Sequence, residues 1–266
     1  MRILAWDIET LPMIVPTWRL FKANVRQDSI IESTSLVCAA WRFVDEEETY
    51  AVSILDKPKK FTANIYDDEH VVKKLYKVLD SGVDILLHQN GDKFDWKKFH
   101  GRVAYYGLPP LPKFRTIDTL KQARKHFALD SNKLDFIGRF FGLGQKIDTG
   151  GMELWDNIVQ LKYPPVGEKP NKILAENSIR FMVKYNIQDV DLLIAIFERI
   201  KPYIDVPNRM LYEGQYDGCP ACRSSVYKKQ GMAYTSLGVY QRYKCLNKEC
   251  GKRFQDTKRI HGTHVR

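Results

Sequence analysis

Arg2-Ile3-Leu4-Ala5-Trp6-Asp7-Ile8-Glu9-Thr10 predicts a buried strand that ends in two acids. Side chains two residues apart on a strand point to the same face, so Asp7 and Glu9 are expected to lie together. Two carboxylates on one face of a buried strand are costly unless something pairs with them. A hard divalent cation such as Mg²⁺ or Mn²⁺ is the simplest partner, because it prefers oxygen ligands. The alternative is that both acids lie at a frayed strand end in solvent.

The residues after this strand predict an α/β domain. Residues 36–44 and 49–55 are strand candidates joined by an acidic turn, which indicates an antiparallel meander, and residues 84–88 form a short apolar strand. Apolar spacing and capping residues predict helices over residues 67–79, 93–106, 116–127, 133–141 and 177–200. The segment 142–172 is rich in Gly, Pro and Lys, and it predicts a long irregular excursion.

Further acids lie on two other elements. Asn90-Gly91-Asp92-Lys93-Phe94-Asp95-Trp96 connects a predicted strand to a predicted helix, so Asp95 either caps the helix or is held at a packed site. Tyr185 and Asp189 are four residues apart on the last predicted helix, and they therefore project from one helical face. Taken alone, this pair also fits a buried tyrosine beside a surface aspartate.

Together and in this order, the three motifs resemble the DEDD exonuclease superfamily. Within it, Asp7-Ile8-Glu9-Thr10 and the Asn90–Trp96 stretch are similar to the 3′→5′ proofreading domain of family-B DNA polymerases. The resemblance covers residues 1–205. It implies an RNase H-like mixed sheet flanked by helices. It also implies hydrolysis of single-stranded DNA to mononucleotides from the 3′ end.

The resemblance also implies roles for individual residues. Asp7, Glu9, Asp95 and Asp189 are expected to hold two Mg²⁺ or Mn²⁺ ions. Tyr185 is expected to orient the attacking water, as in the tyrosine subclass, because the histidine of the other subclass is replaced by Lys184. The residues near the first two motifs that are expected to touch the substrate are Thr10, Leu11, Asn90 and Phe94.

Four of the five cysteines form a second pattern near the C-terminus. Cys219, Cys222, Cys245 and Cys250 give C-x₂-C and C-x₄-C pairs with 22 residues between them. Four thiolates at short paired spacings predict one structural Zn²⁺ in a zinc ribbon over residues 218–257. Disulfides are the alternative, which a reducing compartment disfavours. Residues 206–217 are the predicted linker and residues 258–266 a basic tail.

Positive charge is concentrated around these cysteines. Residues 215–266 hold 6 Lys and 5 Arg against 3 acids, whereas the whole chain has a net charge of +10. A basic block with interleaved aromatic residues indicates a nucleic-acid partner, although a solubilising tail or a protein-docking ribbon would also fit. The residues of the ribbon expected to contact nucleic acid are Lys228, Lys229, Arg242, Tyr243, Lys252 and Arg253.

Three functional hypotheses follow from these patterns. The first is an exonuclease in DNA replication, repair or recombination that acts alone or beside a polymerase or another replication protein. The second is a catalytically silent nucleic-acid-binding or polymerase-accessory module, which the intact acids argue against. The third is a nuclease for RNA or branched DNA.

The sequence predicts a cytoplasmic protein with no membrane partner. It has no apolar run near the roughly 20 residues that span a bilayer, and an acid occurs early in the chain.

Overall fold

A computed structural model describes residues 1–18, 25–147, 150–208 and 217–262. By compactness the chain divides into two units. One contains residues 2–121 and 131–195, and the other contains Met1, residues 122–130 and residues 196–266. The predicted boundaries at residues 205 and 217 stay predictions, and most of the predicted linker lies outside the described residues. Within the described ranges, no helix is both long and apolar enough to cross a membrane.

The first unit is built on a mixed sheet of five strands in the order β3-β2-β1-β4-β5. Strand β1 pairs antiparallel with β2 and parallel with β4, and β4 pairs parallel with β5. This confirms the predicted α/β fold class and the antiparallel meander. The strands are β1 (Ile3–Thr10), β2 (Leu36–Phe43), β3 (Tyr50–Ser53), β4 (Ile85–His88) and β5 (Arg115–Asp118).

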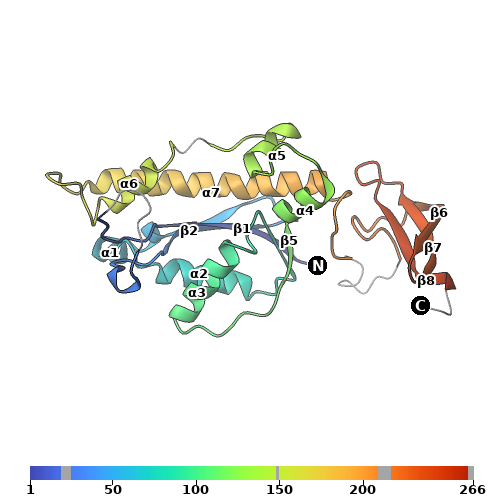
Figure 1. The fold of residues 1–266 in the computed structure, drawn as a ribbon, viewed down its shortest axis with the longest axis horizontal. Coiled ribbons are helices and arrows are strands. Elements are labelled where there is room, and N and C mark those ends of the chain that lie inside the picture. Colours follow the sequence, from blue (N-terminus) through green and yellow to red (C-terminus); the bar gives the residue numbers. More distant parts are fainter. Residues whose placement is uncertain (19–24, 148–149, 209–216, 263–266) are drawn as a thin grey trace. The chain divides into compact units, whose positions relative to one another are not determined.

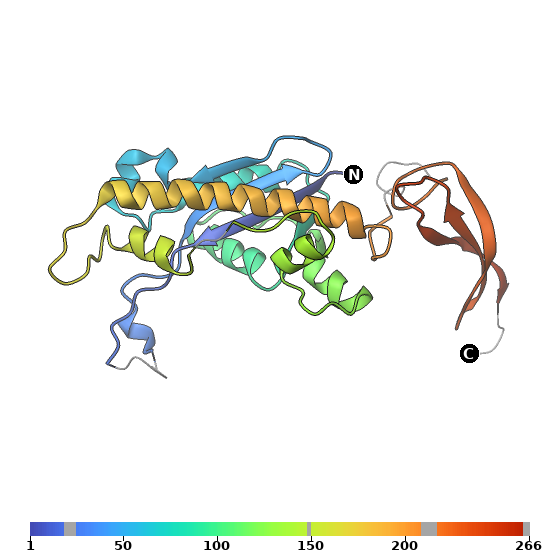
Figure 2. The ribbon, with the colours of Figure 1, turned by 90° about the horizontal axis from the view of Figure 1, so that it is seen from above.

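Helices cover both faces of this sheet. Helices α2 (Glu69–Leu79) and α3 (Asp95–Tyr105) lie on one face, and the long α7 (Lys172–Ile200) lies on the other (Figures 1 and 2). Trp6 of β1 is fully buried and its ring packs edge-on against Phe99 of α3 at 5.9 Å. Because strand side chains alternate, Trp6 and Ile8 fill the core while Asp7 and Glu9 face the opposite side. The other helices of the unit are α1 (Pro58–Ala63), α5 (Leu134–Phe140) and α6 (Glu153–Val159).

Some predicted segments differ from the structure. Residues 116–118, predicted as the start of a helix, belong to β5, and α4 (Thr119–His126) begins only after them. The pairing of β5 with β4 outweighs local helix propensity here. The Asp118 carboxylate then accepts the N–H groups of Leu120 and Lys121 and so begins the helix. The predicted irregular excursion contains α6, and α7 begins at Lys172, five residues earlier than predicted.

The second unit contains a small antiparallel sheet in the order β6-β7-β8. Its strands are β6 (Tyr227–Thr235), β7 (Gly238–Cys245) and β8 (Arg253–Gly262). The four clustered cysteines lie at one end, and three of them are buried. A small antiparallel sheet carrying a four-cysteine cluster therefore confirms this part of the predicted fold class. Residues 258–262 of the predicted tail lie within β8, and residues 263–266 lie outside the described residues.

Candidate active site and cysteine cluster

Three acids from two distant parts of the sequence meet beside β1. Asp7 and Glu9 come from the end of that strand, and Asp189 comes from the middle of α7. One carboxylate oxygen of each lies within 4.8 Å of the others. Asp189 is almost fully buried, and its Oδ1 has no hydrogen-bond partner in the described part of the chain. A buried, unsatisfied carboxylate oxygen among other carboxylates is the arrangement that a hard divalent cation satisfies.

Asp95 lies next to this group. It is the first residue of α3 and is buried. Its charge raises the pKa of Asp7, after the larger effect of burial. The structure therefore groups Asp7, Glu9 and Asp189, and Asp95 at the start of α3 is near enough for its charge to act on that group.

The electrostatics of this group favour a bound cation. Burial, followed by the charges of Asp95, Glu9 and Asp189, raises the pKa of Asp7 well above its usual range. Burial also raises the pKa of Glu9 to about 8 and that of Asp95 to about 6. Because these pKa values are raised, the four acids cannot all ionise near neutral pH without positive charge between them. Divalent ions supply that charge, so the residues present fit the predicted Mg²⁺ or Mn²⁺ ions.

Two residues of this site were missed by the sequence analysis. The side chain of Asn186, fully buried on α7, donates from Nδ2 to Asp7 Oδ2 at 2.6 Å. The Lys146 ammonium donates to Asp189 Oδ2 and, at 2.7 Å, to the Tyr185 hydroxyl. Asn186 follows Tyr185 in the third motif and was therefore open to prediction, but Lys146 lies in a segment without periodicity that gave no signal.

Tyr185 lies beside the acids, as its helical spacing from Asp189 predicted. Burial, followed by the charge of Asp189, raises the Tyr185 pKa to about 12, so the hydroxyl stays protonated at neutral pH. Burial disfavours a charged Lys146, but the Asp189 carboxylate more than offsets this and raises the Lys146 pKa. A neutral phenol and a charged ammonium are thus held next to the acids.

The predicted substrate residues of the first unit differ in accessibility. Thr10 is half-buried at the end of β1, and the Phe94 side chain is exposed beside Asp95. Asn90 adopts a positive φ of 64°, and its N–H donates to Asp118 Oδ1 at 2.9 Å. Leu11 is fully buried in the core, so a direct contact between its side chain and a substrate does not fit the structure.

A second polar cluster lies near the site. His88 Nε2 is 3.0 Å from Asp92 Oδ1, and Asp92 also pairs with Lys121. One ligand atom each of His88, Asp92 and Asp118 lies within 4.8 Å of the others. Because Lys121 already supplies a positive charge and Asp118 is engaged by backbone N–H groups, this cluster holds the 90–95 turn in place.

The four cysteines form a compact group. Cys219 Sγ is 3.7 Å from Cys250 Sγ, and Cys222 Sγ is 3.6 Å from Cys245 Sγ, and all four are free thiols. Burial raises the pKa of Cys245 to about 11 and also raises that of Cys250. Thiolates at these two cysteines are disfavoured unless a cation compensates, and four sulfurs within 4.8 Å of one another suit tetrahedral Zn²⁺. The cluster therefore suggests a structural zinc.

The predicted ribbon contacts fall into two groups. Lys228, Lys229, Arg242 and Arg253 are exposed. In contrast, the Tyr243 ring stacks on Phe254 at 5.6 Å in a small aromatic core, and the half-buried Lys252 donates to the Ile204 carbonyl at 2.5 Å. These last two are partly engaged within the protein, so the four exposed cations are the better candidates for nucleic-acid contact.

Comparisons with known proteins agree with the fold. A family model described as the RNase H superfamily matches residues 42–201. Among solved structures, the chain is similar to the family B DNA polymerase from the hyperthermophilic archaeon Pyrobaculum calidifontis, with a TM-score of 0.51 and 15% sequence identity. The match covers 76% of this chain but only 24% of the polymerase chain. At this identity the likeness is one of fold. No protein with a curated description matches the chain.

Proposed function

Because the chain belongs to the RNase H superfamily, whose members are mostly phosphodiester hydrolases, we propose that its first 205 residues form a 3′→5′ exonuclease that hydrolyses single-stranded DNA to mononucleotides. The superfamily fold implies a nucleic-acid substrate. The observation that carries the proposal is the group of Asp7, Glu9 and Asp189 oxygens, with buried Asp95 beside it. The likeness of the sequence motifs around these acids to those of the proofreading domain is the basis for proposing the 3′→5′ polarity and the preference for a single strand.

The four acids are proposed to hold two Mg²⁺ or Mn²⁺ ions. Such ions lower the pKa of a water and neutralise charge on the leaving 3′ oxygen. Asn186 fixes the orientation of Asp7 through its 2.6 Å hydrogen bond. Tyr185 stays protonated and is placed to orient the attacking water, and Lys146 holds that hydroxyl in turn. A hydroxyl whose position is already fixed loses less entropy when the substrate arrives.

A second candidate, a nucleic-acid-binding module without catalysis, is favoured by one observation. The Lys146 ammonium already pairs with Asp189, so one acid is neutralised without any metal. If this pair persists in the presence of divalent ions, the protein binds nucleic acid but does not cleave it. The two candidates therefore differ in whether metal displaces Lys146.

For the second unit we propose one structural Zn²⁺ and a nucleic-acid-binding surface. Lys228 of β6 is paired across the sheet with Lys244 of β7, which is paired in turn with Arg253 of β8. Like charges directly opposite one another destabilise a sheet. A row of three cations is therefore best explained by a polyanion such as a nucleic-acid backbone. Lys244 adds a residue that the sequence analysis did not single out.

The exonuclease proposal is tested with 5′-labelled single-stranded DNA, double-stranded DNA and RNA in Mg²⁺ or Mn²⁺. We expect single-stranded DNA to shorten as a ladder that releases mononucleotides. Asp7→Ala, Glu9→Ala, Asp95→Ala and Asp189→Ala should each abolish cleavage while circular dichroism shows an intact fold. Early internal fragments would indicate an endonuclease, and full activity in Asp7→Ala or Asp189→Ala would refute the site.

A further inference from the structure

A small cavity beside β1 contains groups that suit an anion. Its volume is about 260 Å³, and its wall includes Thr10, Ser33, Thr34, Lys98 and Arg102. Three hydroxyl-bearing residues and two cationic residues line it, and none of the described residues in its wall is acidic. Hydroxyl donors combined with cations are the groups that proteins use to hold phosphate.

The cavity adjoins the proposed active site through two chain connections. Thr10 directly follows Glu9 on β1, and Lys98 lies three residues after Asp95 on α3. Residues three apart on a helix are surface neighbours. The cavity is therefore lined by residues next to both motifs in the chain, which is where the nucleotide beside the scissile phosphate is expected.

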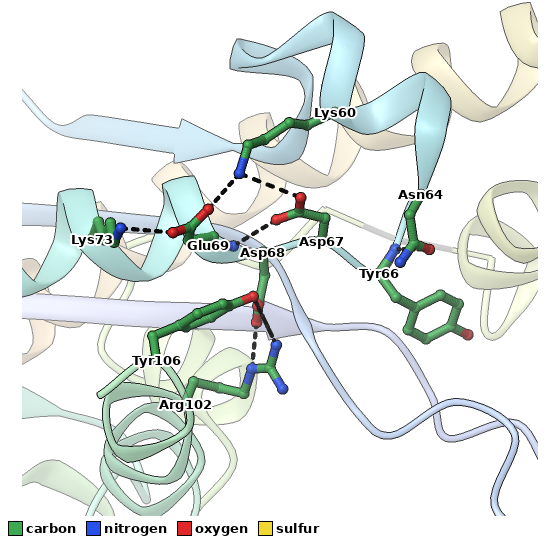
Figure 3. A network of polar contacts seen from close by, with 9 residues as sticks. All are labelled: Lys60, Asn64, Tyr66, Asp67, Asp68, Glu69, Lys73, Arg102 and Tyr106. Carbon is green, nitrogen blue, oxygen red and sulfur yellow. Dashed lines mark hydrogen bonds and ion pairs between the residues drawn. The ribbon is translucent and has the colours of Figure 1, made fainter. Parts of the chain in front are cut away.

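Arg102 is fixed in place by a buried partner. Asp68 is fully buried, and its carboxylate accepts Arg102 Nε at 2.8 Å, a second bond from Nη2, and the Tyr106 hydroxyl at 2.7 Å (Figure 3). The Leu36 N–H also donates to Asp68 at 2.8 Å. Arg102 makes these contacts through Nε and Nη2, and Nη1 has no hydrogen-bond partner among the described residues. Nη1 is therefore a donor whose position is already fixed.

Lys98 supplies the uncompensated charge. Asp68 neutralises Arg102, whereas Lys98 has no ion-pair partner among the residues that the structure describes. Its ammonium lies 5.9 Å from the centre of the exposed Phe94 ring, one helical turn away. A cation beside an exposed aromatic ring is the combination that binds single strands, because the ring stacks on a base while the cation meets a phosphate.

We infer that this cavity is a phosphate subsite for the strand that enters the active site. The Lys98 ammonium, the Arg102 Nη1 group and the hydroxyls of Thr10, Ser33 and Thr34 bind one backbone phosphate next to the scissile one. The inference rests on the proposed function for its substrate, and it adds Lys98 and Arg102 as residues that position the strand.

The test uses Lys98→Gln, with Lys97→Gln as the matched control. Lys97 is the neighbouring exposed lysine of α3 and does not line the cavity. Arg102 is unsuitable, because removing it leaves buried Asp68 unpaired and destabilises the fold. Binding of a short 5′-fluorescein oligothymidylate is followed by fluorescence anisotropy, with Ca²⁺ in place of Mg²⁺ to prevent cleavage. We expect Lys98→Gln to bind about fivefold more weakly, with a log K versus log salt slope smaller by about 0.7, whereas Lys97→Gln leaves both near wild type.

A methylphosphonate scan identifies the contacted phosphate. Each oligothymidylate carries one neutral linkage, and its affinity is measured for wild type and for Lys98→Gln. At one linkage near the 3′ end, wild type should lose about fivefold in affinity while Lys98→Gln loses little, because the contact is already absent. The same loss in both proteins at every linkage would overturn the subsite, as would equal binding by the Lys98 and Lys97 variants.

The outcome is separable from that of the exonuclease proposal. If wild-type protein cleaves DNA but the Lys98 and Lys97 variants bind alike, the subsite is wrong and the exonuclease stands. If the scan shows one sensitive linkage but no metal supports cleavage, the subsite stands and the exonuclease proposal fails.

Discussion

Replacing Lys146 by Met is expected to destabilise the metal-free protein more than the metal-bound protein. Without divalent ions the Lys146 ammonium pairs with Asp189 and donates to Tyr185. Lys146→Met leaves the Asp189 carboxylate buried without its partner, which destabilises the metal-free protein. When Mg²⁺ is bound, the metal takes over the compensation of Asp189, so the same substitution should then cost little.

The magnitude follows from the burial of the pair. The Asp189 side chain is 4% exposed and that of Lys146 is 27% exposed. Breaking a fully buried pair costs about 3–5 kcal/mol, whereas a surface pair contributes about 0–1 kcal/mol. The partly exposed lysine places this pair between these limits, at about 2 kcal/mol. For a chain of this size that corresponds to a Tm about 4–8 °C lower in EDTA.

Differential scanning fluorimetry in EDTA and in Mg²⁺ measures the effect. The control is Lys162→Met, which removes the pair between Lys162 and Glu32 outside the site. Its Tm change should be the same in both conditions. An equal lowering of the Tm by Lys146→Met with and without Mg²⁺ would refute this role of Lys146, as would a greater stabilisation of wild type than of the variant by Mg²⁺.

Three other predictions concern pH, zinc and salt. In EDTA the free energy of unfolding should fall as pH rises from about 5 to about 8, measured by urea titration, because the raised pKa values of Glu9 (about 8) and Asp95 (about 6) mean that the folded state binds more protons than the unfolded chain. Saturating Mg²⁺ should remove this slope. Cys250→Ser should lower the zinc content, measured by a chromogenic chelator after denaturation, from one ion per chain to well below one. The double variant Lys228→Gln/Lys244→Gln should lower the magnitude of the log K versus log salt slope for single-stranded DNA by about 1.4, and Lys248→Gln/Lys258→Gln should change it less.

The parts of the fold with strong local signals could be predicted from sequence. The alternation in β1 and the helical spacing of α7 each depend on residues close in the chain, so the faces that carry Asp7, Glu9 and Asp189 were predictable. The paired cysteine spacings indicated a four-sulfur site for the same reason, and the structure brings these sulfurs together. In each case the pattern repeats within a few residues and reports which side chains share a face.

The features that sequence reasoning missed depend on contacts between distant segments. Residues 116–118 have helix-like neighbours, but their pairing with β4 makes them a strand. Lys146 reaches Asp189 across 43 residues, and Arg102 meets Asp68 across 34 residues. Leu11 follows the first motif closely but turns into the core. Local sequence periodicity carries no information on such contacts, so the positions of these side chains could be found only from the structure.

The central claim is that Asp7, Glu9, Asp95 and Asp189 together hold two divalent ions. Isothermal titration calorimetry of the zinc-loaded protein with Mn²⁺ tests this most directly. Asp189→Asn is the variant that removes one of the proposed metal ligands. Glu198→Gln is the control, because Glu198 is exposed and pairs with Lys201, nine residues beyond Asp189 on α7. The account predicts two Mn²⁺ per chain in wild type and in Glu198→Gln, and fewer than two in Asp189→Asn. Two Mn²⁺ retained in Asp189→Asn, or an ion lost in Glu198→Gln, would contradict it.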